Sequence, residues 1–144
     1  MTYEETLHYL YTSIPVFQHS GASAYKPGLG TSIALDDYLG NPHKAYKTIH
    51  VAGTNGKGSV SHLLAAILRQ SGFKVGLYTS PHLVDFRERI RVNGKKISQD
   101  YVVDFVERHR SFFEPLHPSF FELTSSMAFE YFRDQQVDYA VIEV

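Results

Sequence analysis

Hydrophobic residues follow two different periodicities along this chain, and their order predicts an α/β fold. Largely apolar runs of the kind found in buried strands lie at 48–52, 75–79 and 137–144. Between the first two runs, residues 59–70 carry apolar side chains at helical spacing. The predicted inward face comprises Val60, Leu63, Leu64, Ile67 and Leu68. Strand, helix and strand joined by short turns within about thirty residues form a right-handed βαβ unit, and therefore a parallel sheet.

Capping residues predict where further helices begin. A hydroxyl residue followed three positions later by glutamate is a capping box, and this spacing occurs over Thr2–Glu5 and Ser119–Glu122. We therefore expect helices over about 2–13 and 119–135. The glutamates of both boxes have a structural explanation, because each bonds the backbone at its own helix start.

Two more helices and a hairpin complete the predicted elements. One helix is expected over 32–39 with Gly40 as its C-cap, and another begins after Ser98 and ends near residue 114. Asn93 and Gly94 form the two-residue turn of a hairpin. The helix residues expected to face the core are Ile33, Leu35, Leu39, Tyr101, Val102, Phe105 and Val106. A basic cluster lies on the hairpin and comprises Arg87, Arg89, Arg91, Lys95 and Lys96.

Composition limits the classes of function. The 144 residues are 43% hydrophobic and 20% charged, which suits one globular domain or part of one. A formal charge of −1 gives no reason to expect nucleic acid or an anionic membrane as a partner. The chain has no cysteine, no apolar run long enough to span a bilayer and no signal-peptide layout, so we expect a cytoplasmic protein.

The clearest chemical signal is the glycine-rich turn between strand 48–52 and helix 59–70. Three glycines in six positions let the backbone turn sharply and point N–H groups inward, and a lysine adds a cation at the positive end of the helix dipole. This arrangement suits a polyphosphate. The predicted binding residues are Gly53, Thr54, Asn55, Gly56, Lys57, Gly58 and Ser59.

The usual phosphate-loop pattern is not met in this turn. That pattern is Gly-x-x-x-x-Gly-Lys-[Ser/Thr], whereas here the first glycine lies three positions before Gly56, and Gly58 separates Lys57 from Ser59. The alternative interpretation is a plain strand-to-helix turn with a solvated lysine. The order of strand, glycines, lysine, hydroxyl and helix favours phosphate binding.

Two oxygen-bearing side chains follow the other predicted strands. Glu143 ends the third apolar run, and a carboxylate at the tip of a buried strand is costly unless a positive group such as Mg²⁺ meets it. Ser80 leaves the carboxyl end of the second strand, where ligands gather in open α/β sheets. The alternatives are an acid that emerges into solvent and a serine that begins a proline turn.

The turn 53–59 reads Gly-Thr-Asn-Gly-Lys-Gly-Ser and resembles the loop of the folylpolyglutamate synthases, which are related to the Mur peptidoglycan ligases. Mur enzymes usually have Lys-Thr in place of Lys-Gly-Ser. Further matches to the folate branch are Leu-Gly-Asn-Pro at 39–42, His-Val-Ala at 50–52, Thr-Ser-Pro-His-Leu at 79–83, Glu-Arg-Ile at 88–90 and Asn-Gly at 93–94. The resemblance runs from about residue 39 to 144, and enzymes of that family are considerably longer.

The resemblance implies a P-loop-type three-layer α/β domain with a mostly parallel sheet, of which residues 1–144 are the N-terminal portion of the ATP-binding part. It implies ATP and Mg²⁺ as cofactors, Lys57 as the catalytic residue, and Ser59, Ser80 and Glu143 as metal ligands. It implies a substrate-binding role for Lys26, Pro81, His82, Phe86 and Arg89. Lys26 is alternatively a solvated loop lysine, and the basic hairpin is alternatively an exposed charged ribbon.

The activity that the resemblance implies is ATP-dependent addition of L-glutamate to a folate, or to dihydropteroate, through an acyl phosphate. Two alternatives stay open: a nucleotide-binding module without turnover, and a Mur-type amino-acid ligase. The fragment alone is expected to be inactive, because further strands and the C-terminal domain of that family are missing. We expect a monomeric full-length enzyme, whereas uncovered sheet edges in the fragment favour self-association.

Overall fold

The computed structural model describes residues 1–14, 29–82 and 84–144, and the chain divides into two compact units. Unit 1 comprises Met1–Asn41 and Gln99–Met127, and unit 2 comprises Pro42–Ser98 and Ala128–Val144. The helix α6 (Phe120–Asp134) contributes its first half to unit 1 and its second half to unit 2. The assignment of residues 1–144 to one ATP-binding domain stays a prediction.

Unit 2 is built on a five-stranded sheet with the strand order β1-β5-β2-β3-β4. The first three strands in this order are parallel, and β3 and β4 add an antiparallel hairpin to the edge of β2. The strands are β1 (Lys47–Val51), β2 (Val75–Tyr78), β3 (Ile90–Val92), β4 (Lys95–Lys96) and β5 (Tyr139–Glu143). The predicted α/β class with a mostly parallel sheet is confirmed.

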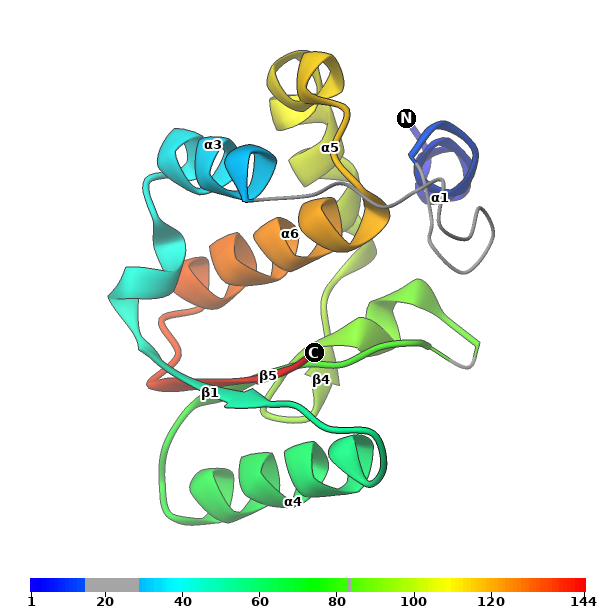
Figure 1. Cartoon of the computed structure of the whole chain (residues 1–144). Helices are drawn as coiled ribbons and strands as arrows, with labels where there is room; N and C mark the ends of the chain where they lie inside the picture. The colour runs from blue at the N-terminus through cyan, green and yellow to red at the C-terminus, as the bar shows by residue number, and fades with distance from the viewer. Residues whose placement is uncertain (15–28, 83) are drawn as a thin grey trace. The chain divides into compact units, whose positions relative to one another are not determined.

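Helices cover both faces of the sheet in unit 2, as Figure 1 shows for α4 (Lys57–Gln70) on one side of β1 and β5 and for the last turns of α6 on the other. On the α4 face, the core residues are Val75, Leu77 and Val141, with Val51, Leu64, Ala65 and Leu68 packed against them. On the opposite face, Gly76 lies so close to Phe132 of α6 that an added Cβ would be 2.6 Å from the ring. The sheet is therefore sandwiched between two helical layers.

Two expectations about the first βαβ unit are wrong. β1 is not buried, because β5 inserts between β1 and β2 and leaves β1 at the sheet edge with an exposed burial pattern. Only part of the predicted face of α4 packs inward: Leu64 and Leu68 contact the sheet, whereas Leu63 is 61% exposed. The exposed apolar residues of α4 are Val60, Leu63 and Ile67. The apolar face of α4 is therefore wider than the part of the helix that contacts the sheet.

Unit 1 consists of helices, and its caps follow the predicted pattern. α1 (Tyr3–Ser13) begins with the capping box of Thr2 and Glu5. α3 (Gly30–Leu39) ends at Gly40 in the left-handed conformation, and α5 (Gln99–Phe113) follows Ser98. The first half of α6 begins with a capping box in which Ser119 and Glu122 exchange hydrogen bonds. Short 3-10 turns, η2 (Pro42–Ala45), η3 (Phe86–Arg89) and η4 (Glu114–Leu116), lie between the longer elements.

Aromatic and aliphatic side chains fill the space between the helices of unit 1. Tyr11 of α1 stacks on Phe120 at 5.3 Å between ring centroids, and Tyr38 of α3 stacks on Phe112 at 3.8 Å. Of the helix residues expected to face the core, Leu35, Leu39, Val102, Phe105 and Val106 are buried. Ile33 was expected to face the core, but it is 55% exposed, so that expectation is wrong. Within the described ranges, no helix combines the length and hydropathy that a bilayer crossing requires.

We expect Gly76→Ala to destabilise the protein, because the added Cβ would lie within 2.8 Å of three atoms of the Phe132 ring. Overpacking of this kind costs about 1–3 kcal/mol. Urea unfolding followed by circular dichroism measures the loss. Gly30→Ala is the control, since no atom lies within 4 Å of its added Cβ, and its free energy of unfolding should change by less than about 0.5 kcal/mol. Equal effects of the two substitutions would contradict the close packing of α6 on β2.

Candidate nucleotide-binding site

The glycine-rich turn joins β1 to α4 in the conformation that its sequence predicts. Gly53 and Gly56 have positive φ values of 152° and 75°, and Gly56 is the N-cap of α4. These backbone conformations are strained for residues with a Cβ, so glycine is needed at both positions. The N–H groups of the first turn of α4 have no partner within the helix and carry the positive end of its dipole. The turn therefore presents donors to an anion.

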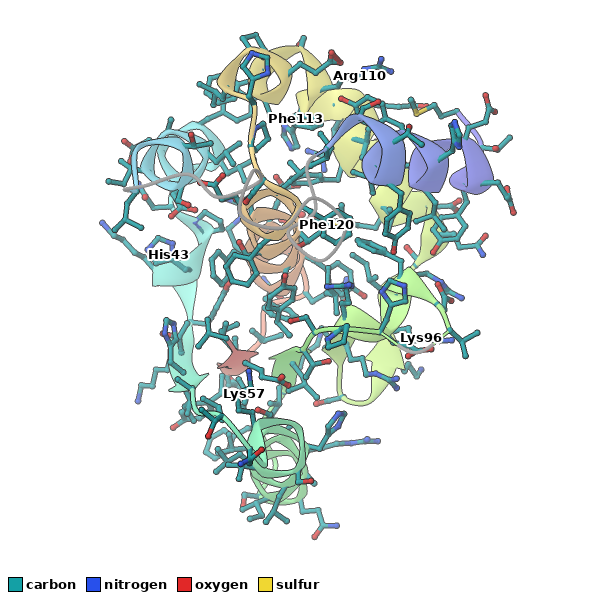
Figure 2. All side chains as sticks on the ribbon, turned by 45° about the vertical axis from the view of Figure 1, so that its right-hand side comes forward. His43, Lys57, Lys96, Arg110, Phe113 and Phe120 are labelled. Atoms are coloured by element: carbon teal, nitrogen blue, oxygen red, sulfur yellow. The ribbon has the colours of Figure 1, made fainter. Side chains whose placement is uncertain are left out.

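Lys57 reaches from the start of α4 to the end of β5. Its Nζ donates a hydrogen bond to the backbone oxygen of Val144 at 3.0 Å, and Figure 2 shows the labelled Lys57 next to the end of that strand. The Val144 amide in turn donates to the backbone oxygen of Val51 at 3.0 Å. The ammonium group is thus held where β1, β5 and α4 meet.

Glu143 is a buried carboxylate beside this turn. Glu143 is 5% exposed, and its backbone pairs in register with Val51 at the end of β1. Its Oε2 lies 3.9 Å from the position that a Cβ on Gly58 would take. Among the described residues, none forms a hydrogen bond or ion pair with the Glu143 side chain. The acid therefore does not emerge into solvent, and it lies directly beside the first turn of α4 without a counter-charge.

The two predicted serine ligands lie at the same edge of the sheet. Ser59 is exposed in the first turn of α4, and Ser80 follows β2, whose last residue Tyr78 pairs with Ile142 of β5. In the part of the chain that the structure describes, no group of three or more histidine, aspartate or glutamate residues is arranged so that it could hold a metal ion by itself. Two hydroxyls and one carboxylate fit Mg²⁺, which is bound through few protein oxygens together with phosphate and water. Their role as ligands stays a prediction.

The segment after β2 brings three of the predicted substrate residues together. Arg89 is 6% exposed, and its Nε donates a hydrogen bond to His82 Nδ1 at 2.8 Å. The Phe86 ring is buried and meets the His82 ring at 74° and 6.3 Å between centroids. Pro81 is exposed and follows a cis peptide bond from Ser80. Lys26 lies outside the described residues.

The surroundings of His82 favour its neutral form. Burial lowers the pKa of His82, and the positive charge of Arg89 lowers it further, against the smaller opposing effects of Glu88 and Asp85. Because Nδ1 accepts the bond from Arg89, the proton of the neutral ring lies on Nε2. The loop therefore presents an uncharged donor instead of an imidazolium.

Known proteins of similar sequence and structure identify the family. No protein-family model matches the chain. The dihydrofolate synthase/folylpolyglutamate synthase of Bacillus subtilis (strain 168) is 39% identical over 125 residues, which cover 82% of this chain. The crystal structure of folylpolyglutamate synthase from Thermotoga maritima has a TM-score of 0.87 and 46% identity, and an FPGS-AMPPCP-folate complex has a TM-score of 0.84 and 36% identity. The chain belongs to the folylpolyglutamate synthase/dihydrofolate synthase family.

The matched regions are only part of these folylpolyglutamate synthases. The chain spans 29% of the Bacillus subtilis protein. The structural matches cover 99% of this chain but 32% of the Thermotoga maritima enzyme, and 100% of this chain but 35% of the protein in the folate complex. The chain therefore spans about a third of the length of the relatives that it matches.

In this folylpolyglutamate synthase family member, one set of residues that orders the loop was not predicted. Asp85 caps η3 and accepts bonds from the Arg87 amide and Nε, both at 3.1 Å, while Glu88 accepts from the Asp85 amide at 2.9 Å. The Thr79 amide donates to the Arg89 backbone oxygen at 2.9 Å and closes the loop. Capping-box spacing at Asp85–Glu88 is the sequence signal for this turn. The lysine contact with the Val144 carbonyl has no such signal, because it joins distant segments.

We expect His82 to titrate below its ordinary pKa of 6.5. As the pH falls through 6.5, the unfolded chain takes up this proton before the folded chain does, so the free energy of unfolding decreases towards the folded-state pKa. NMR titration of the His82 ring measures the pKa, and urea unfolding over the same range measures the slope. In Arg89→Gln the pKa should rise, because the positive charge of Arg89 is one of the two causes that lower it. A His82 pKa above 6.5 in the unsubstituted chain would contradict this description.

We expect Glu143→Gln to stabilise the chain in the absence of nucleotide. The substitution removes a buried charge that has no partner among the described residues, and gains at such functional positions are about 0.5–2 kcal/mol. Thermal unfolding measures the change. Asp134→Asn is the control, because Asp134 is exposed and lies 3.5 Å from Arg133 Nε. A loss of stability in Glu143→Gln would show that the carboxylate is already compensated.

Proposed function

We propose that this chain supplies the nucleotide-binding part of an ATP-dependent ligase that adds L-glutamate to a folate, or to dihydropteroate. The observation that carries the proposal is the buried Glu143 carboxylate, which lies without a partner beside the first turn of α4 and next to Lys57. A carboxylate in this position is costly in the free protein and is compensated when a cation binds. The names of the relatives, which include FPGS complexed with AMPPCP and folate, support a nucleotide and a folate as ligands.

The residues of the turn have separate tasks in this proposal. Backbone N–H groups from Thr54 to Ser59 hold the phosphates of ATP. Lys57 gives up its hydrogen bond to the Val144 oxygen and neutralises the charge that develops on the β,γ-bridging oxygen. Ser59, Ser80 and Glu143 hold Mg²⁺. When bound, this ion neutralises charge on the phosphate oxygens. The other contributions come from electrostatic stabilisation and positioning by the protein.

The proposed reaction proceeds in two steps. A carboxylate oxygen of the folate attacks the γ-phosphorus of ATP, the bond to the β,γ-bridging oxygen breaks, and ADP leaves. The amino group of L-glutamate then attacks the carbonyl carbon of the acyl phosphate, a proton is lost from nitrogen, and inorganic phosphate leaves as the amide forms. No residue of the described part of this site is required as a general base in this scheme, so electrostatic stabilisation and orientation supply the catalysis.

The loop 80–89 forms one wall of the folate pocket in this proposal. Pro81, His82 and Phe86 offer an exposed ring, a neutral N–H donor and an aromatic face. The Nε of Arg89 donates to His82, so Arg89 orients this imidazole, and its guanidinium is retained as the predicted contact for a substrate carboxylate. Lys26 is retained as a predicted contact from the segment outside the described residues.

Two further aspects of the proposal concern the whole protein. We propose a cytoplasmic, monomeric enzyme with small-molecule substrates and no nucleic-acid partner, while this chain alone binds nucleotide without turnover. The exposed apolar residues of α4 and the uncovered edge of β1 support self-association of the separate chain. A Mur-type ligase is the second candidate, but no observation in the described site favours it over the folate ligase.

We expect the chain to bind ATP in the presence of Mg²⁺ and Lys57→Ala to weaken this binding at least about tenfold, which corresponds to about 1.4 kcal/mol. Isothermal titration calorimetry with Mg²⁺ and with EDTA measures both dependences. Lys44→Ala is the matched control, because Lys44 is an exposed lysine of η2 outside the turn, and it should bind like the unsubstituted chain. Absence of nucleotide affinity in the folded, unsubstituted chain would overturn the proposed site.

The ligase part is tested in a full-length family member that carries this sequence. ADP should form only when a folate or dihydropteroate and L-glutamate are both present, and Lys57→Ala should abolish it. ADP formation that depends on a muramyl substrate instead would reject the folate ligase while leaving the nucleotide site intact.

A further inference from the structure

A second group of side chains converges on the α4 face of the sheet, away from the glycine-rich turn. Neighbouring residues of a strand point to opposite faces, and Gly76 faces Phe132 of α6, so Val75 and Leu77 face α4. Leu77 pairs directly with Arg91 of β3. Arg91 therefore lies on the same face as Leu77 and points into the space beside α4.

A cavity of about 190 Å³ occupies this space. Its floor is apolar and includes Ala65, Val75 and Leu77, and its polar lining residues are His62, Arg69, Arg91 and Asn93. Among the described residues, no aspartate or glutamate lines it. The cavity thus combines hydrocarbon with cationic and hydrogen-bonding groups, and it lacks an internal counter-charge.

The two arginines of this cavity differ from the other arginines of the chain. Four arginines lie within 4.0 Å of a carboxylate, and Arg89 bonds to His82. Neither Arg69 nor Arg91 has a carboxylate within that distance in the described ranges. Arg91 is nonetheless held in place, because its Nε donates to the Glu88 backbone oxygen at 3.3 Å. Two guanidinium groups that face one cavity without an acid repel each other unless an anion joins them.

The hairpin turn is shaped to admit the second guanidinium. Gly94 has a φ of 81°, and a Cβ there would lie 2.8 Å from Arg69 Nη1, so a larger residue would displace this side chain. Asn93 Oδ1 accepts a hydrogen bond from the Val75 amide at 2.9 Å, which fixes the side-chain amide and leaves its NH₂ group as a donor. The cavity therefore has donors from three side chains, of which Arg91 and Asn93 are held by hydrogen bonds to the backbone and Arg69 lies against Gly94.

We propose that this cavity is a second ligand site, which binds the carboxylate or phosphate group of a small anion through Arg69 and Arg91. Guanidinium groups bind both kinds of oxyanion with two parallel hydrogen bonds, and the apolar floor accommodates a short carbon stem. The site is separate from the glycine-rich turn, since Lys57 and Arg69 are about 18 Å apart along the axis of α4 at 1.5 Å per residue. The inference does not depend on the proposed ligase activity.

The test is an NMR titration of the 144-residue chain with inorganic phosphate and, separately, with succinate, each against chloride at equal ionic strength. The Gly94 amide and the Arg69 and Arg91 Nε–H signals report on the cavity, whereas the Gly56 amide reports on the glycine-rich turn. We expect saturable shifts at Gly94 with at least one of the two anions. Saturation by phosphate alone assigns a phosphate site, and saturation by succinate alone assigns a carboxylate site.

Arg91→Gln and Arg69→Gln should each weaken this binding at least about fivefold, since each removes one charge-assisted pair of hydrogen bonds. Lys95→Gln is the matched control, because it removes a positive charge from the same hairpin outside the cavity, and it should change the affinity less than about twofold. Arg91→Lys keeps the charge without the paired geometry and should fall between these results. Absence of a saturable shift at Gly94, or equal weakening in Arg91→Gln and Lys95→Gln, would overturn the proposal.

Discussion

The site depends on one electrostatic constraint, a buried carboxylate that has no counter-charge among the described residues. Glu143 stands at the tip of β5, whose last four residues are buried, and the ammonium group of Lys57 is bonded to the Val144 backbone oxygen instead. Burial of an uncompensated charge is costly in free energy. Other interactions of the fold must offset this free-energy cost. β5 contributes to them because it lies between β1 and β2 and is hydrogen-bonded along both edges. The pairing of β5 along both edges thus offsets the cost of burying the Glu143 carboxylate.

The same sheet separates two kinds of surface. At the carboxyl ends of the parallel strands, helix dipole, lysine and hydroxyls form a polar site around Glu143. On the α4 face, near the start of β2, arginines stand over an apolar floor. The alternation of side chains along β2 directs Val75 and Leu77 to the α4 face, while Gly76 faces Phe132 of α6. The missing side chain of Gly76 lets α6 approach the sheet closely on that opposite face.

Local chemistry made much of this structure predictable. Capping boxes at Thr2 and Ser119, the Asn93–Gly94 turn and the glycine-rich loop each depend on a few consecutive residues, and each is present as predicted. The exposure of β1 and of Leu63 was not predictable in the same way. It follows from the strand order, in which β5, 92 positions further along the chain, lies between β1 and β2, and no local pattern records that pairing. The hydrogen bond from Arg89 to His82 is a similar case. Both residues were predicted to bind substrate, but no sequence pattern predicted a bond between them.

The position of β5 between β1 and β2 also has a consequence for how the polypeptide acquires its structure. β1 pairs with no described strand other than β5, yet β5 is made from the last residues of this sequence. During translation the backbone N–H and C=O groups of β1 cannot pair with β5 until Glu143 has left the ribosome. Long-range pairing of this kind slows folding and prolongs exposure of apolar segments. β1 therefore lacks its partner strand over the whole interval between the synthesis of Lys47 and that of Glu143.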